Sequence, residues 1–166
     1  MKLLKYVCKP LLMLFICMLV DTHLSNLLQS ILPMTIYPVA HLLLIFLLFL
    51  SINLPDAVTI GLLLVIGILY DAYYFHLIGI VALILPSMGI FVNHFGVILM
   101  RNRWTRLLSV LILIVFFDSF LFAMASLLGI SMAVFSHFVV YMLAPTLVLN
   151  VVLVLLLQPV MEKIYL

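Results

Sequence analysis

The stretch LLLIFLLFL, from Leu42 to Leu50, contains only apolar residues, and VVLVLLL, from Val151 to Leu157, repeats this character near the end of the chain. A transmembrane β-strand alternates apolar and polar residues over about ten positions, whereas these two runs are continuous and rich in leucine. The runs therefore favour membrane-spanning α-helices over a transmembrane barrel.

The composition of the whole chain agrees with these runs. Of its 166 residues, 69% are hydrophobic and 7% are charged, against about 45–50% and about 25% in soluble domains. A soluble core of this size cannot bury so many apolar side chains, so most of them must face lipid or other membrane helices. A span takes about 20 apolar residues, which leaves room for six spans and for no extramembrane domain. The expected fold class is an all-α polytopic membrane protein with a single integral membrane domain, residues 1–166.

The apolar runs and the residues that interrupt them predict six transmembrane helices, near residues 7–28, 36–52, 57–74, 77–95, 105–127 and 132–158. All seven Lys and Arg residues lie before or at the start of the first span, at or near the turn between the fourth and fifth spans, or after the sixth. Cytoplasmic loops collect positive charge, and an even number of spans separates these groups, so both termini are predicted to be cytoplasmic. We expect a multi-pass protein of the bacterial cytoplasmic membrane that does not bind nucleic acid.

Two carboxylates inside or near the predicted spans are candidate functional groups, because ionisable side chains are costly there and usually have a role. Asp118, in the fifth span, suggests either a proton or cation pathway together with His137 or a buried contact with another helix. We favour the buried contact, because no Lys or Arg lies deep within the spans to act as a partner. Asp71 ends the third span, where it can bond the backbone of the turn into the fourth span, and Gly79 would let that helix approach closely.

The last predicted span carries Pro145, Thr146 and Asn150. Pro145 is expected to leave the carbonyl one turn earlier without its helical partner. The resulting kink offers Thr146 and Asn150 partners within the helix or on a neighbouring helix. Such a pattern suits either a helix interface or a ligand pocket, and the sequence leaves both open.

Motifs for catalysis and metal binding are missing from the sequence. We find no GxSxG element, no Gly-rich phosphate loop and no cluster of paired carboxylates. The five histidines and two cysteines lack the spacing of metal ligands. We therefore expect no enzymatic activity, no cofactor and no metal site.

The spacing of these features resembles the MreD family of rod shape-determining proteins, in the form found in Gram-positive bacteria. The matching motifs are Gly67-x-x-x-Asp71 followed by Leu77-Ile78-Gly79-Ile80, and Pro145-Thr146-x-x-x-Asn150 followed by Gln158-Pro159. The resemblance implies structural or partner-binding roles for Gly67, Asp71, Gly79, Pro145 and Asn150. Asp118 matches no motif of the family.

By this resemblance the protein would be a non-catalytic membrane scaffold subunit of the bacterial cell-elongation machinery. The implied partners are the bitopic membrane protein MreC, a RodA-type glycosyltransferase and a class B penicillin-binding protein, with which the family helps organise peptidoglycan synthesis and rod shape. The resemblance also implies a fold similar to the substrate-binding subunits of energy-coupling-factor transporters. A small-molecule-binding subunit of a membrane transporter is therefore the alternative function, although the first span lacks the Ala-x-x-x-Ala pattern associated with docking in those transporters.

Overall fold

The computed structural model describes residues 2–33, 35–51, 54–75 and 79–165, and within these ranges the chain is helical with no β-strand. Its α-helices and π-helical segments (η) follow one another as α1 Lys2–Ile31, α2 Leu42–Ser51, α3 Asp56–Tyr70, η1 Asp71–Phe75, α4 Ile80–Leu99, α5 Arg103–Leu127, α6 Phe135–Phe138, η2 Val139–Leu143 and α7 Ala144–Tyr165. α3 continues directly into η1, and α6 continues through η2 into α7. An all-helical fold is confirmed for this part of the chain.

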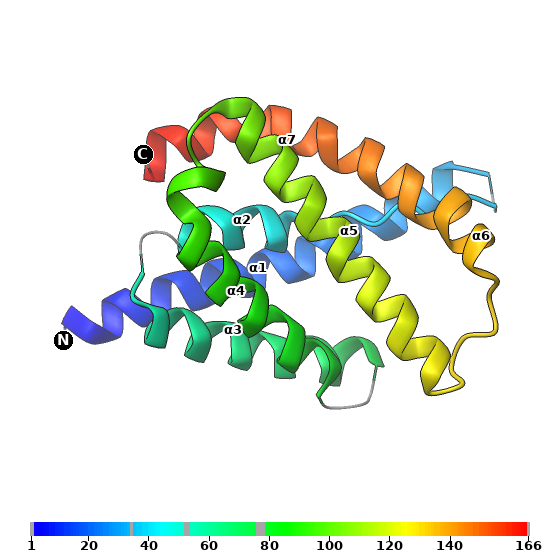
Figure 1. Ribbon diagram of the computed structural model, residues 1–166, viewed down its shortest axis with the longest axis horizontal. Coiled ribbons are helices and arrows are strands. Elements are labelled where there is room, and N and C mark those ends of the chain that lie inside the picture. Colours follow the sequence, from blue (N-terminus) through cyan, green and yellow to red (C-terminus); the bar gives the residue numbers. More distant parts are fainter. Residues whose placement is uncertain (1, 34, 52–53, 76–78, 166) are drawn as a thin grey trace.

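Five helical stretches are long and apolar enough to cross a membrane: Val7–Ile31, Asp56–Tyr74, Ile80–Leu99, Arg103–Leu127 and Phe135–Lys163. Five of the six predicted spans therefore correspond to long apolar helices. Both chain ends lie at the same end of the helical bundle (Figure 1). Residues 52, 77 and 78, at the edges of two predicted spans, lie outside the described residues.

The predicted second span, residues 36–52, is not confirmed as a full-length transmembrane helix. Residues 36–41 are non-helical, and only the ten residues of α2 form a helix. Ten helical residues are about 15 Å long, half of the roughly 30 Å of a bilayer core. Pro38 lies in the non-helical part, and side chains from α1 and α7 bond the backbone there, as described below. The expectation of six full-length helices is therefore not confirmed.

α2 forms the centre of the protein instead of facing lipid. Eight of its ten residues are buried, and it contacts α1, α4, α5 and α7. Phe49 of α2 belongs to one buried cluster with Leu14 and Met18 of α1, Ile84 of α4 and Phe117 of α5. A helix that is apolar on all sides suits such a fully buried position.

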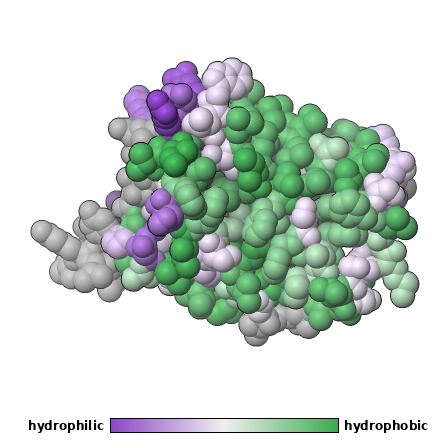
Figure 2. All heavy atoms as spheres, viewed as in Figure 1, coloured by the Kyte–Doolittle hydropathy of each residue, from purple (hydrophilic) through white to green (hydrophobic). Residues whose placement is uncertain are grey.

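The outer surface has the polarity that a bilayer requires. Large apolar side chains such as Leu83, Ile112 and Val148 are well exposed along α4, α5 and α7. Figure 2 shows a broad apolar surface along the bundle and a gathering of hydrophilic residues at the end where both termini lie. Apolar sides with a polar end are typical of a helical bundle inserted in lipid.

Candidate functional site

Asp71 closes the hairpin between α3 and α4. Its fully buried carboxylate accepts hydrogen bonds from the backbone N–H groups of Gly79 (2.8 Å), Val81 (2.8 Å) and Ala82 (3.0 Å). The first N–H groups of a helix have no acceptor within the helix, and a carboxylate also complements the positive end of the helix dipole. Asp71 therefore fixes the start of α4, as its position at the turn indicated.

Two positions of the same hairpin require glycine, one because there is no space for a side chain and the other because of its backbone angle. A Cβ atom at Gly67 would lie 2.5 Å from the Cα atom of Ala82 and 2.9 Å from the carbonyl oxygen of Val81. α3 and α4 can therefore approach this closely only without a side chain at Gly67. Gly79 has a φ angle of 128°, which side-chain-bearing residues rarely adopt. The other two residues of the motif, Leu77 and Ile78, lie outside the described part of the chain.

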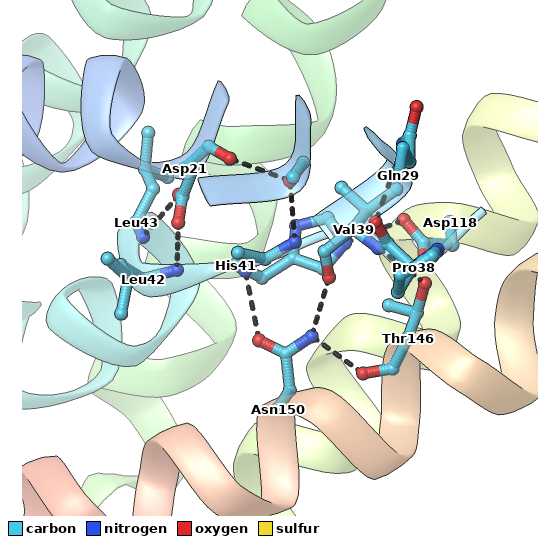
Figure 3. Close-up of polar contacts among 12 residues, drawn as sticks. Asp21, Gln29, Pro38, Val39, His41, Leu42, Leu43, Asp118, Thr146 and Asn150 are labelled. Atoms are coloured by element: carbon cyan, nitrogen blue, oxygen red, sulfur yellow. Dashed lines mark hydrogen bonds and ion pairs between the residues drawn. The ribbon is translucent and has the colours of Figure 1, made fainter. Parts of the chain in front are cut away.

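Asn150 of α7 holds the non-helical segment before α2, residues 36–41 (Figure 3). Its side-chain oxygen accepts a hydrogen bond from the N–H of His41 (2.9 Å), and its amide nitrogen donates to the carbonyls of Val39 (2.8 Å) and Thr146 (2.8 Å). The hydroxyl of Thr146 accepts from the N–H of Val39 (3.0 Å). These side chains therefore bond backbone N–H and carbonyl groups of the segment, which in a helix would have bonded to one another.

Pro145 adds a further bond to the same segment. Proline has no N–H, so the carbonyl four residues earlier, on Tyr141, lacks its helical donor. The N–H of Tyr37 donates to that Tyr141 carbonyl at 2.9 Å. The carbonyl that the sequence analysis expected Pro145 to leave free thus has a partner in the non-helical segment.

α1 holds the other side of the segment through Asp21 and Ser25. The carboxylate of Asp21 accepts hydrogen bonds from the N–H groups of Leu42 (2.6 Å) and Leu43 (2.9 Å), at the start of α2. The hydroxyl of Ser25 accepts from the N–H of Ala40 (2.9 Å) and donates to the carbonyl of Asp21 (2.6 Å). Neither residue was among the candidates predicted from the sequence, although a carboxylate inside a long apolar helix was the available signal.

Asp118 is paired with a residue that the sequence analysis did not connect to it. Its Oδ1 atom lies 3.1 Å from Nε2 of His41, and both side chains are buried. The other carboxylate oxygen, Oδ2, is buried and has no hydrogen-bond partner among the described residues. His137, the other member of the expected pathway, is exposed, and its ring packs on Tyr141. Asp118 is therefore a buried contact between α5 and the segment before α2.

A cavity of about 210 Å³, lined by both polar and apolar residues, adjoins this pair. Asp21, Asn26, His41, Tyr70 and Asp118 are among the residues that line it. The cavity is thus bounded by two carboxylates and an imidazole together with apolar side chains. Within the described residues, no group of three or more His, Cys, Asp and Glu side chains could hold a metal ion.

A cluster of charged side chains joins α5 to α7 at the end of the bundle where the termini lie. The carboxylate of Glu162 accepts hydrogen bonds from Arg103 (Nε at 3.1 Å, Nη2 at 2.9 Å), from Nη2 of Arg106 (2.8 Å) and from the amide of Gln158 (3.2 Å). Gln158 belongs to the last motif of the family resemblance. The positive charges of the first turn of α5 therefore help to hold α7 against α5.

The fold and these contacts define a class: a multi-pass helical membrane protein whose buried polar side chains bond mainly the backbone of its own neighbouring segments. The chain belongs to the rod shape-determining protein MreD family, whose model matches residues 7–166. It is 37% identical over 148 residues to the cell shape-determining protein MreD of Streptococcus pneumoniae, covering 89% of this chain and 90% of that protein. The protein is therefore a multi-pass protein of the cytoplasmic membrane with a role in cell shape.

No solved structure matches this fold. The similarity to the substrate-binding subunits of energy-coupling-factor transporters stays a prediction.

Proposed function

We propose that this protein is a non-catalytic scaffold subunit of the cell-elongation machinery, which binds an MreC-type bitopic protein and helps organise peptidoglycan synthesis. The observation that carries the proposal is how the buried polar groups are used. Asp21, Asp71 and Asn150 each bond backbone groups of a neighbouring segment. These side chains hold the fold together, and binding to partners is left to the outer surface. Membership of a cell-shape family supports the same role.

The outer surface of α5 is the part that we assign to the MreC helix. Ile112 and Phe116 are exposed one turn apart, and hollows of about 300 Å³ and 440 Å³ flank them on either side. Association of membrane helices depends on packing, because lipid tails are as apolar as leucine side chains. Ile112 and Phe116 thus form an exposed ridge between two hollows, and such a ridge offers a partner helix more packing contact than a flat face does.

The test is co-purification from mild detergent with an MreC-type protein that is produced together with this chain. We expect the wild-type protein to retain the MreC-type protein. The Ile112→Trp variant should lose most of the bound MreC-type protein, because the larger side chain keeps a partner helix from packing against this surface. Val148→Trp on α7 is the matched control, since Val148 is similarly exposed and lines neither hollow. Failure of the wild-type protein to associate would overturn the scaffold function. Equal retention by both variants would overturn only the assignment of the α5 surface.

The small-molecule-binding subunit of a transporter is the second candidate function. The cavity beside Asp118 favours it, because one carboxylate oxygen there lacks a partner in the described structure. Asp118→Asn removes the charge while keeping the side-chain size. A scaffold with this substitution should still bind the MreC-type protein, whereas a transporter subunit should lose a small molecule that mass spectrometry detects in the wild-type preparation.

A further inference from the structure

A hollow of about 380 Å³ opens between the first turns of α5 and the last turns of α7. It is lined by Arg103, Trp104, Leu107, Leu155, Gln158 and Pro159. It lies at the end of the bundle where the termini and the turn between α4 and α5 meet, and where hydrophilic residues gather (Figures 1 and 2). The hollow is therefore placed where membrane helices meet lipid headgroups.

The charge around this hollow is positive. Arg103 and Arg106 share a single carboxylate, that of Glu162, which leaves one positive charge in surplus. Arg101, next to them, is exposed. An added anion would be attracted to such a cluster.

The hollow also has an apolar part. Leu107 and Leu155 lie on its α5 and α7 sides, beyond the charged residues, and Leu155 is exposed along the side of the bundle. The indole of Trp104 is 75% exposed at the rim, which is the position that tryptophan favours at a membrane interface. Positive charge beside an apolar groove matches a molecule with an anionic headgroup and a hydrocarbon chain.

We propose that this hollow between α5 and α7 binds one anionic phospholipid, with the phosphate beside Arg103 and an acyl chain against Leu107 and Leu155. Anionic headgroups are concentrated on the cytoplasmic leaflet and are attracted to basic residues there. A free phosphate would use only the charged part of the hollow, whereas a lipid also uses the apolar part. The site adds a lipid ligand to the proposed scaffold and does not depend on binding to an MreC-type protein.

The experiment is native mass spectrometry of the protein released from mixed micelles that contain phosphatidylglycerol or phosphatidylcholine. We expect one phosphatidylglycerol molecule to be retained and phosphatidylcholine to be lost. Arg103→Gln should lower phosphatidylglycerol retention about five-fold, in line with the usual contribution of one basic residue near a membrane surface. Lys9→Gln is the matched control, since it removes one exposed positive charge on α1 without touching the hollow.

A second variant keeps the proposal testable if Arg103→Gln weakens the fold. Leu155→Trp fills the apolar part without changing any charge, and it should lower phosphatidylglycerol retention as well. Equal losses in Arg103→Gln and Lys9→Gln would show that attraction is spread over the basic end, which would overturn the site. Displacement of the lipid by millimolar glycerol phosphate would also overturn it, because a free anion would then bind as well as the lipid.

Discussion

Replacing Gly67 with alanine adds one methyl group between α3 and α4. The new Cβ atom would lie 2.5 Å from the Cα atom of Ala82, whereas ordinary contacts begin at 3.4 Å. The shortfall is 0.9 Å (3.4 − 2.5), and backbone atoms of a helix cannot rotate away as a side chain can. α4 must therefore shift as a unit.

The shift has a second cost, because the hydrogen bonds that N–H groups at the start of α4 donate to Asp71 measure 2.8–3.1 Å. A displacement of this size would stretch some of them beyond bonding distance. Overpacking of a close contact costs about 1–3 kcal/mol. Gly61 is the matched control on the same helix, since a Cβ atom there meets nothing within 4 Å. Both variants gain the same helix propensity, so the difference between their unfolding free energies, about 1–3 kcal/mol, isolates the packing cost.

Unfolding is measured by adding sodium dodecyl sulfate to the protein in a mild detergent. Cys17 is buried and Cys8 is exposed, so thiol labelling of Cys17 in a Cys8→Ser background reports unfolding. We expect Gly67→Ala to unfold at a lower fraction of dodecyl sulfate than wild type, and Gly61→Ala at an equal or higher fraction. Identical midpoints for the two variants would refute the close approach of α3 and α4.

The same assay tests four further single substitutions, one of which, Asn93→Ala, is a control. Asn150→Ala leaves a backbone N–H and a carbonyl of the segment before α2 without partners, and it should cost about 1–3 kcal/mol. Asn93→Ala, which removes one exposed hydrogen bond, should change the unfolding free energy by less than about 0.5 kcal/mol. Asp71→Asn should cost about 1–2 kcal/mol, because an NH₂ group replaces one oxygen that faces backbone donors. Glu162→Gln should lower the unfolding midpoint by leaving the buried Arg106 without its carboxylate, and adding Arg106→Met should restore most of the loss.

The sequence predicted those contacts of the candidate site that are local along the chain. Asp71 bonds backbone groups 8–11 residues away, within one helical hairpin, so its position beside a turn indicated its partners. The bonds of Asn150 to His41 and Val39 cross 109 and 111 residues. Asn150 showed the need for partners, but no local rule could say which segment would supply them. The contact between Asp118 and His41 went unpredicted for the same reason.

The sequence by itself determined that this is a helical membrane protein, because continuous apolar runs with few charges are stable only as helices in a bilayer. It also determined five of the spanning helices through their length and hydropathy. Only the tertiary structure decided that Leu42–Ser51 is a short helix at the centre of the bundle. Lipid and the interior of a membrane protein are both apolar, so hydropathy does not distinguish a residue that faces lipid from one that faces other helices. That distinction depends on polar groups of α1 and α7, which hold the preceding segment in place from positions far away in the sequence.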